Sequence, residues 1–371
     1  MQLYYIGLMS GTSMDGVDAA LVSFETNGSG SDHAITLIET ISIPIPEKIK
    51  SNLTLLCRGD NISLKLLGET DTQMGNLFAG AVLKLLSKAK INANAIAAIG
   101  SHGQTIYHHP HLPHPFTMQI GDPNIIAART NITTVADFRR KDIALGGQGA
   151  PLVPAFHAAL FGRKKYDQII LNIGGIANIT YLPANREKKI IGFDTGPGNT
   201  LLDLWCEKHC NKPFDKNGEW ARSGKLNTEL LARLLDDPYF KKPFPKSTGR
   251  DYFNLNWLGN SGGGSDHAEN IQNTLTELTV KTIADAITHT HIPTIWLCGG
   301  GAYNTFLIER LHAHLPNADI KSTHEIGIDP QWIEACAFAW LAKQTMENKP
   351  GNLSSVTGAA KMAVLGGIFQ V

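Results

Sequence analysis

The sequence predicts an α/β protein of about two domains. Its 371 residues correspond to about two domains of roughly 150 residues each. Apolar, strand-like runs at residues 3–8, 169–173 and 294–298 each lead into a glycine-containing turn. Helical patterns, in which apolar residues recur three and four positions apart, lie between these strands. Hairpins early in the chain and strand–helix units later on predict sheets layered with helices.

The expected elements follow one another along the chain. Further strands, rich in Ile, Leu and Val, are expected at residues 19–24, 34–43, 133–136, 176–182 and 190–193. Two helices are predicted from the apolar faces formed by Met74, Leu77, Phe78, Ala81 and Leu85, and by Ile271, Leu275, Leu278, Thr282 and Ile287. A late helix should begin at Asp329 and Pro330, because Asp caps helices and Pro suits a first turn, and run to about Gln344. A short helix is expected around Lys361 and Met362.

Two glycine- and proline-containing stretches, at residues 142–154 and 348–355, predict crossings between the domains. We therefore expect an N-terminal domain formed by residues 1–140 plus 352–371, and a C-terminal domain formed by residues 141–351. The segment at residues 237–246 contains three prolines and is expected to be an exposed loop.

Composition excludes several classes of protein. The formal net charge is +0 and the pI is near 7.2, so the chain as a whole has no basic field for nucleic acid or an anionic membrane. A charged fraction of 18% is low for a disordered protein. The sequence contains neither a secretory signal at its start nor an apolar run of about 18 residues that would span a membrane. Five cysteines without a C-x-x-C pair fit a reducing cytoplasm.

The three glycine turns are candidate nucleotide-binding segments. Glycines let backbone N–H groups approach a phosphate closely, and the hydroxyl groups of the first turn add donors. That turn, GTSMDG at residues 11–16, also fits an ordinary hairpin. The second, NIGGIAN at 172–178, fits a tight hairpin, and the third, GGGAYN at 299–304, fits close strand–helix packing. The chain lacks the G-x-x-x-x-G-K-[ST] pattern of P-loop proteins.

Asp194 is the candidate catalytic carboxylate. It directly follows the apolar run at residues 190–193 and precedes a Thr-Gly-Pro-Gly-Asn segment. A carboxylate at a strand end among glycine turns suits a general base or a magnesium ligand. An Asx-type turn is the structural alternative.

Other polar groups at strand ends are candidates for binding a polyol or a carboxylate. His102, Gln104 and Thr105 follow one strand, and Asp137 and Arg140 follow another, although surface polarity would also explain both groups. Glu334 shares a helical face with Phe338 and Leu341, so its carboxylate requires a partner or a ligand unless it serves only the helix dipole.

Together these segments resemble the anhydro-N-acetylmuramic acid kinase family, in order and over nearly the whole chain. The matching motifs are MSGTSMDGVD at residues 9–18, SHGQT at 101–105, ADFR at 136–139, NIGGIAN at 172–178, FDTGPGN at 193–199, CGGG at 298–301 and EACAFA at 334–339. The first and fifth motifs are the most specific.

The resemblance implies a two-domain fold of the actin-like ATPase and sugar kinase type with an interdomain cleft. It also implies ATP and Mg²⁺ as cofactors, a small amino sugar as substrate, and a homodimer. The family's reaction opens a 1,6-anhydro ring with water and phosphorylates the freed 6-oxygen. Asp194 matches the family's catalytic base. The implied nucleotide-binding residues are Gly11, Thr12, Ser13, Met14, Asp15, Gly16, Val17, Asp18, Asn172, Gly174, Gly175, Gly196, Gly198, Asn199, Gly299, Gly300, Gly301 and Asn304. The substrate-binding candidates are His102, Gln104, Thr105, Asp137, Arg140 and Glu334, and the metal ligands stay open.

Three alternatives remain at this stage. An ordinary kinase of the same fold would phosphorylate a free hydroxyl without using water. An actin-like chaperone ATPase would turn over ATP in response to protein and would need a peptide-binding segment, for which the sequence shows no C-terminal extension. A nucleotide-binding protein without catalysis would leave Asp194 without a role.

Overall fold

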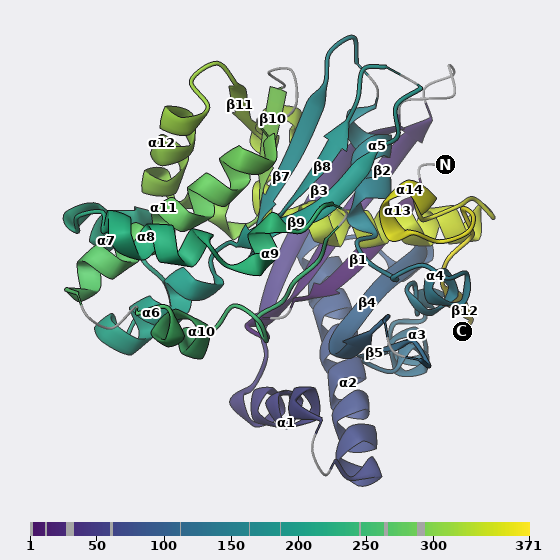
Figure 1. Cartoon of the computed structure of the whole chain (residues 1–371). Coiled ribbons are helices and arrows are strands. Elements are labelled where there is room, and N and C mark those ends of the chain that lie inside the picture. Colours follow the sequence, from purple (N-terminus) through teal and green to yellow (C-terminus); the bar gives the residue numbers. More distant parts are fainter. Residues whose placement is uncertain are drawn as a thin grey trace. The chain divides into compact units, whose positions relative to one another are not determined.

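The computed structural model describes residues 3–11, 13–26, 33–59, 62–111, 113–162, 164–185, 187–244, 246–262, 266–287 and 294–371. The chain divides into two compact units, whose helices and strands are labelled in Figure 1. Unit 1 comprises Met1–Gly162 and Trp332–Val371, and unit 2 comprises Arg163–Gln331. Each unit is described separately below.

Both crossings between the units differ from the prediction. The chain passes from unit 1 to unit 2 later in the sequence than predicted, and it returns to unit 1 earlier. The crossings lie next to residues 162 and 332, whereas the glycine- and proline-rich stretches placed them at residues 140 and 352. The first of these stretches stays in unit 1 because buried Asp142 accepts hydrogen bonds from the Gly149 backbone and the Asn352 side chain. The helix that carries Glu334 also belongs to unit 1 rather than to the second domain.

Unit 1 is built on a seven-stranded sheet among the described residues, with strand order β12-β6-β4-β1-β2-β3 and β5 paired to β4. Its strands are β1 (Tyr4–Ser10), β2 (Gly16–Thr26), β3 (His33–Pro44), β4 (Ile96–His109), β5 (Phe116–Ile120), β6 (Thr134–Ala136) and β12 (Gly367–Phe369). Its helices are α1 (Glu47–Arg58), α2 (Leu64–Ala89), α3 (Pro123–Thr130), α4 (Arg140–Ala144), α5 (Val153–Phe161), α13 (Ile333–Met346) and α14 (Ser354–Thr357). The central strand β1 is antiparallel to β2 and parallel to β4.

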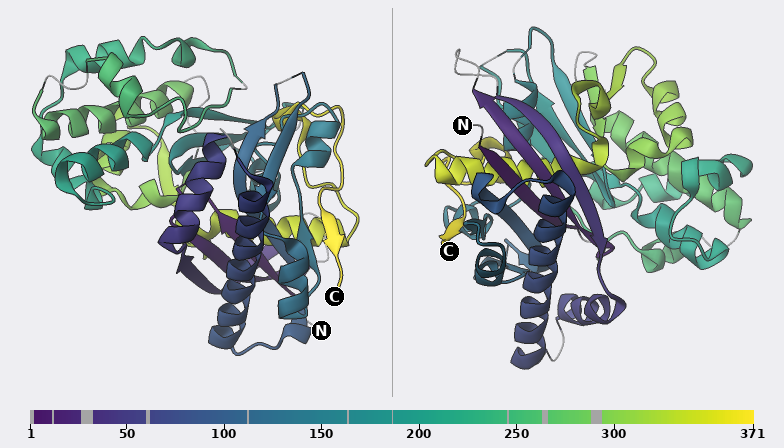
Figure 2. Two further views of the ribbon diagram at one scale, coloured as in Figure 1. Left: turned by 90° about the horizontal axis from the view of Figure 1, so that it is seen from below. Right: turned by 180° about the vertical axis from the view of Figure 1, so that it is seen from behind.

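Side-chain alternation along β1 determines how unit 1 is layered. Ile6 and Leu8 are fully buried in one core cluster together with Met74 and Phe78 of α2. Gly7 points to the other face, where a Cβ atom would collide with the backbone of Ala335 in α13. The long helix α2 and the late helix α13 therefore cover opposite faces of the same strand, and Figure 2 shows α2 running along the sheet.

Unit 2 contains a five-stranded sheet among its described residues, in the order β11-β10-β7-β8-β9. Its strands are β7 (Gln168–Ile173), β8 (Ile176–Leu182), β9 (Ile191–Pro197), β10 (Thr294–Cys298) and β11 (Asp319–Ser322). Its helices are α6 (Thr200–Cys210), α7 (Glu219–Ser223), α8 (Thr228–Leu235), α9 (Pro238–Lys241), α10 (Leu255–Asn260), α11 (Ala268–Ile287) and α12 (Thr305–His314). Strands β7, β8 and β9 form an antiparallel meander, while β10 runs parallel to both β7 and β11.

The predicted glycine turns are confirmed as connections between elements. The first joins β1 to β2, the second joins β7 to β8, and the third leads from β10 through a short 3-10 turn, Gly300–Tyr303, into α12.

The two predicted helices are confirmed as α2 and α11. The core of unit 2 includes Leu275 and Leu278 of α11, which are almost fully buried.

The late helix begins later than predicted. The side chain of Asp329 accepts a hydrogen bond from the Gln331 backbone at 2.9 Å, so it caps a 3-10 turn at Pro330–Trp332. Helix α13 follows at Ile333–Met346. Asp329 therefore acts as a cap, as predicted, but it caps a 3-10 turn rather than the start of the α-helix.

Two local expectations are wrong. Residues 358–366 form no helix, because Ala363 exchanges hydrogen bonds with Gly351 and the Asn352 side chain and so diverts the backbone from a helical ladder. The segment expected to be an exposed loop at residues 237–246 includes helix α9 and a Tyr239 side chain that is only 1% exposed. Asp237 and Pro238 start this helix, since the Asp237 side chain accepts from the Tyr239 backbone. Pro245 lies outside the described residues.

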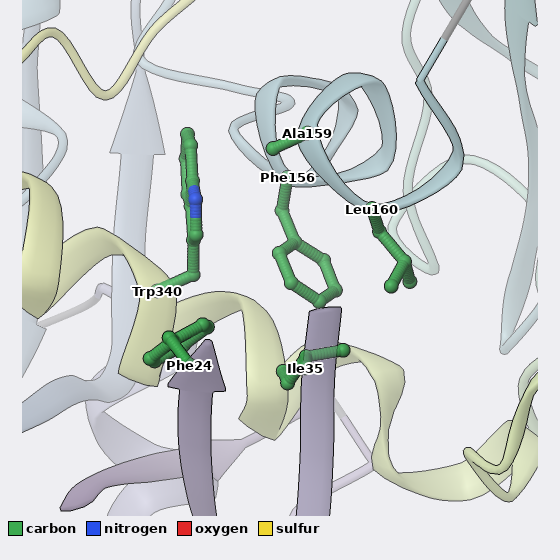
Figure 3. Close-up of a pocket in the computed structure, with 6 residues that line it drawn as sticks. All are labelled: Phe24, Ile35, Phe156, Ala159, Leu160 and Trp340. Atoms are coloured by element: carbon green, nitrogen blue, oxygen red, sulfur yellow. The ribbon is translucent and has the colours of Figure 1, made fainter. Parts of the chain in front are cut away.

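A small hollow in unit 1 is apolar. It lies between β2, β3, α5 and α13, as Figure 3 shows, and is lined by Phe24, Ile35, Phe156, Ala159, Leu160 and Trp340. It contains no ionisable side chain and offers no chemistry for a reaction. In the described part of the chain, no helix has the length and apolar character needed to cross a bilayer.

Candidate active site

In unit 1, three parallel strands bring the predicted polar residues to one edge of the sheet. Strands β1, β4 and β6 run parallel, so their carboxyl ends lie on the same side. Buried Ser10 at the end of β1 donates from its hydroxyl to Oε1 of Gln104 at 2.6 Å and approaches the Gly16 carbonyl oxygen at 3.1 Å. Gln104 is thereby fixed beside the first glycine turn.

The first glycine turn is tight. The Met14 backbone donates to the Gly11 carbonyl oxygen at 3.2 Å, and Met14 has a left-handed φ of 55°. Asp15 is exposed and pairs with Lys50 at 3.3 Å. Thr12 lies outside the described residues. The Val17 side chain is fully buried in the core, so only its backbone is available to a ligand at this turn.

Arg139, rather than Arg140, enters the polar network. Its Nε and Nη2 atoms lie 3.2 and 2.8 Å from Nε2 of His102, and Nη1 donates to the Gly149 carbonyl oxygen at 2.8 Å. Arg140 is exposed and faces Asp137 at 3.6 Å, apart from this network. The family motif ADFR includes Arg139 as its last residue and excludes Arg140. This motif was the signal in the sequence that favoured Arg139.

Glu334 belongs to the same network. A Cβ atom on Gly7 or Gly100 would collide with the backbone of α13, so the two glycines let this helix lie directly on β1 and β4. Burial raises the pKa of Glu334, the positive charge of Arg139 opposes that rise, and the negative charge of Asp18 adds to it. Burial also lowers the pKa of Arg139 to about 10. Glu334, Arg139 and Asp18 therefore interact electrostatically in a site with little water.

The other predicted substrate residues are placed differently. The Thr105 hydroxyl accepts from Nε2 of Gln119 at 3.1 Å, so it is engaged in the β4–β5 pairing. Asp137 adopts a left-handed φ of 59° and is partly exposed. The structure thus gathers His102, Gln104 and Glu334 near the end of β1 and the middle of β4. The sequence predicted His102, Gln104 and Thr105 after a strand, but they lie within β4, because the strand continues to His109. Asp137 and Arg140 pair with each other nearer the surface.

In unit 2, two glycine turns lie at neighbouring strand ends. Strands β7 and β10 are parallel, with Asn172 opposite Cys298. A Cβ atom on Gly301 would collide with the side chain of Ile173, so the turn after β10 packs directly against the end of β7. Such adjacent carboxyl ends are the usual ligand position in sheets of this kind. Asn304 caps α12 by accepting from the Leu307 backbone at 3.1 Å.

The turn between β7 and β8 is joined to the start of α6. The backbone N–H groups of Gly198, Asn199 and Thr200 donate to the carbonyl oxygens of Gly174 and Gly175 over 2.8–3.0 Å. Gly198 has no room for a Cβ atom, because one would collide with the Gly174 carbonyl. This close approach explains the glycine at position 198.

Asp194 lies inside β9, not after it. The register between β8 and β9 shifts at Asn178, leaving Thr195 as an extra residue next to Asp194. Such bulges re-aim side chains and often lie beside active sites. The sequence analysis missed this extension because Gly196 and Pro197 are poor strand residues, although here they pair with Ala177 and Ile176.

The Asp194 carboxylate is half-buried and sparsely hydrogen-bonded. Its Oδ2 accepts from the Thr248 backbone at 3.0 Å, and its own backbone is held by the Lys246 carbonyl and the Tyr239 hydroxyl. Burial raises the pKa of Asp194 to about 7, and the Thr248 hydrogen bond opposes this only in part. A carboxylate that titrates near neutrality can take a proton from water at physiological pH.

A model of the anhydro-N-acetylmuramic acid kinase family matches residues 3–371. The chain belongs to this family. Two relatives of that name illustrate the likeness. The protein from Coxiella burnetii (strain RSA 493 / Nine Mile phase I) is 55% identical over 368 residues, which cover 98% of this chain and 97% of the relative. The protein from Shewanella loihica is 52% identical over 369 residues, covering 99% and 98%.

One solved structure resembles this member of the anhydro-N-acetylmuramic acid kinase family weakly. A ROK family glucokinase from Streptomyces griseus, in complex with glucose and AMPPNP, is 12% identical with a TM-score of 0.41, covering 92% of this chain and 99% of the other. Two sheets in two α/β units confirm the predicted α/β class and the division into two domains.

Proposed function

We propose that this chain is an ATP-dependent kinase acting on 1,6-anhydro-N-acetylmuramic acid. It opens the anhydro ring with water and phosphorylates the 6-oxygen, giving N-acetylmuramic acid 6-phosphate and ADP. Membership of the anhydro-N-acetylmuramic acid kinase family over nearly the whole chain supports this activity. The observation that carries the chemistry is Asp194, a half-buried carboxylate whose burial raises its pKa to about 7.

The proposed reaction couples two bond changes. Asp194 takes a proton from water, and the water oxygen attacks the anomeric carbon on the face opposite the anhydro bridge. The bond between that carbon and the 6-oxygen breaks, and the electron pair stays on the 6-oxygen. That oxygen attacks the γ-phosphorus of ATP in line, and ADP leaves. Phosphoryl transfer to the 6-oxygen replaces the general acid that an inverting glycosidase would need.

Unit 1 supplies the proposed sugar-binding residues. We assign Glu334 and Arg139 to hydrogen bonds with the sugar, with His102 orienting the Arg139 guanidinium through the contacts at 3.2 and 2.8 Å. Gln104, held by Ser10, is a further donor and acceptor. Thr105, Asp137 and Arg140 remain weaker candidates, because the first is engaged with Gln119 and the other two face each other near the surface.

The glycine turns supply the proposed nucleotide contacts. At Gly11 and Gly174 the backbone is open, since a Cβ atom there would meet no other atom closer than 3.5 Å, so phosphate or ribose can approach the chain closely. Among the described residues, no three His, Cys, Asp or Glu side chains gather to hold a metal ion by themselves. Mg²⁺ is often bound by one or two carboxylates plus substrate phosphates, where it neutralises phosphate charge. Asp18, half-buried and with its pKa raised by burial, fits that role.

The proposed setting follows from the proposed substrate. An amino sugar released from peptidoglycan is recycled or scavenged inside the cell, so we assign the enzyme to the cytoplasm. We also assign a homodimeric state, which rests on the family resemblance alone.

The test uses magnesium, ATP and the anhydro sugar in ¹⁸O-labelled water, with products analysed by mass spectrometry at early times. We expect a 6-phosphorylated reducing sugar that carries the label at its anomeric oxygen. Phosphorylation of free N-acetylmuramic acid alone would instead indicate an ordinary sugar kinase. ATP loss without sugar turnover would point to a chaperone-like ATPase.

A further inference from the structure

A short strap, defined here as residues 246–250, connects the catalytic carboxylate of unit 2 to its phosphate turn. At its start, the Lys246 carbonyl oxygen accepts from the Asp194 backbone at 2.9 Å. Two residues on, the Thr248 backbone donates to Oδ2 of Asp194 at 3.0 Å. The strap therefore runs alongside β9 and fixes the Asp194 side chain from a second segment of chain.

At its other end the strap places Arg250 against the turn between β7 and β8. A Cβ atom on Gly175 would lie 3.2 Å from both Nε and Nη2 of Arg250, and 2.8 Å from the Thr200 hydroxyl. The guanidinium and the hydroxyl thus lie over the backbone of Gly175. Only glycine leaves room for them there.

Three polar atoms of the strap and of the turn that it reaches are buried without a hydrogen-bond partner in the described part of the chain. They are Nε of Arg250 and the hydroxyl oxygens of Thr200 and Thr248. The Thr200 side chain is 1% exposed, and it lies in the first turn of the 11-residue helix α6. Leaving buried donors unpaired costs free energy, so such a group points to a ligand that is anionic and rich in acceptors.

The charge balance also favours an anion. Among the described residues, Arg250 takes part in no ion pair, although other arginines of unit 2, such as Arg222 and Arg310, are paired with glutamates. A planar guanidinium with several N–H donors matches phosphate or carboxylate oxygens. The helix dipole at the start of α6 adds a further preference for negative charge.

We propose that Arg250 is a phosphate-binding residue that, with the Thr200 hydroxyl, holds the terminal phosphoryl group of the nucleotide over the Gly175 turn. This assignment rests on the proposed function. The same strap that holds Asp194 then holds the phosphoryl group, so the base and the group to be transferred are positioned by one segment. The guanidinium neutralises charge as the phosphoryl group passes from ADP to the 6-oxygen, a role in which single arginines contribute about 1,000- to 100,000-fold in related phosphoryl transfers.

The experiment compares Arg250→Ala and Arg250→Lys with wild type and with Arg233→Ala. Arg233 is an exposed arginine of the same unit that contacts the Ser261 carbonyl, so it controls for the loss of a surface charge. Calorimetry measures the affinities for ATP and ADP separately, and steady-state kinetics measure kcat and the KM values for ATP and sugar. Circular dichroism and the thermal unfolding midpoint confirm that each variant is folded.

We expect Arg250→Ala to lower kcat by at least about 100-fold and to remove most of the preference for ATP over ADP, while the affinity for the sugar stays unchanged. Arg250→Lys should recover part of the ATP preference, because it keeps the charge but not the planar fork. Arg233→Ala should match wild type in every measurement.

Two results would overturn the proposal. One is unchanged affinity for both nucleotides with kcat within about threefold of wild type. The other is a loss of sugar affinity with nucleotide binding intact, which would assign Arg250 to the sugar's carboxylate. Should the wild-type protein fail to turn over the anhydro sugar, the proposed function would fail, yet the ATP and ADP affinities would still decide the role of Arg250. If Arg250→Ala does not fold, Arg250→Lys and Thr200→Val supply the same comparison.

Discussion

Arg139 donates to Nε2 of His102 from two atoms of its guanidinium, at 3.2 and 2.8 Å. Because arginine only donates, this ring nitrogen must accept, and the ring proton belongs on Nδ1. Burial and the Arg139 charge hold the pKa of His102 well below its usual range, which agrees with a neutral ring. His102 therefore orients the guanidinium without carrying charge itself.

The first prediction concerns Glu334. Glu334→Ala removes the carboxylate that interacts with Arg139, so we expect the KM for the sugar to rise about 10- to 100-fold, the range for a hydrogen bond to a charged group. The affinity for ATP, measured by calorimetry, should stay within about twofold. Glu69→Ala, which removes an exposed carboxylate paired with Lys65 in α2 of the same unit, is the control. An unchanged sugar KM in Glu334→Ala would rule out a role in substrate binding.

The second prediction concerns Asp194. Asp194→Asn should lower kcat by about 100- to 10,000-fold, because general-base catalysis is lost, while nucleotide affinity is retained. The control is Asp236→Asn, which changes an exposed carboxylate paired with Lys241. Near-normal turnover in Asp194→Asn would remove this residue from the mechanism.

The pH dependence of Asp194 tests the same assignment in two ways. The base must be deprotonated, so kcat/KM for the sugar should fall as the pH drops through about 7. The raised pKa means that the folded state favours the protonated form, so this stabilisation is complete below the unfolded pKa and is lost as the pH rises through about 7. Asp194→Asn should therefore unfold at a higher temperature than wild type at pH 8 but not at pH 4. The opposite ordering would contradict the burial argument.

The third prediction concerns Gly7. Gly7→Ala should destabilise unit 1 by about 1 to 3 kcal/mol, because the added methyl collides with the Ala335 backbone and forces α13 away from β1. Since α13 carries Glu334, the sugar KM should rise as well. Gly80→Ala in α2 is the matched control: no atom lies within 4 Å of its new methyl group, so it should stabilise by about 0.5 to 1 kcal/mol. Urea unfolding and kinetics measure both effects, and equal stabilities for the two variants would refute the packing argument.

The fourth prediction concerns Asp142. Its fully buried carboxylate accepts from the Gly149 backbone, the Asn352 amide and the Thr357 hydroxyl at 2.6–2.8 Å. Asp142→Ala leaves these donors unpaired, so we expect a loss of about 3 kcal/mol or more in unfolding free energy. Glu69→Ala, which breaks an exposed pair with Lys65, should cost under about 1 kcal/mol. A small effect in Asp142→Ala would show that water replaces the lost acceptor.

Much of the fold could be predicted because the signals are local. Alternating apolar residues and glycine turns are sufficient to place β1 and β2 and the hairpin of β7 and β8. The missing helix near Lys361 shows the limit, because Asn352, eleven positions before Ala363, takes the backbone hydrogen bond that a helix would need. Likewise, the crossings between the units depend on contacts of Asp142 that are distant in sequence.

The candidate site was predictable in part for the same reason. Asp194 is signalled by its own neighbours, since a carboxylate follows an apolar run and precedes glycines. Arg139 and Arg140 are adjacent and chemically alike, so apart from the ADFR motif, which ends at Arg139, the sequence does not show which of them meets His102. Arg250 carries no strand-end signal, because it is brought to Gly175 by a connection whose course depends on tertiary contacts.

The return of the chain from unit 2 to unit 1 sets the order in which the protein can be assembled during synthesis. Unit 2 is one continuous stretch, Arg163–Gln331, so all its strands are synthesised before α13 is. Unit 1 cannot complete its packing until later. The faces of β1 and β4 at Gly7 and Gly100 are covered only when α13 emerges from the ribosome. The unit that carries Asp194 is thus complete in sequence before α13 emerges, while the nascent sheet of unit 1 keeps one side open until translation is nearly over.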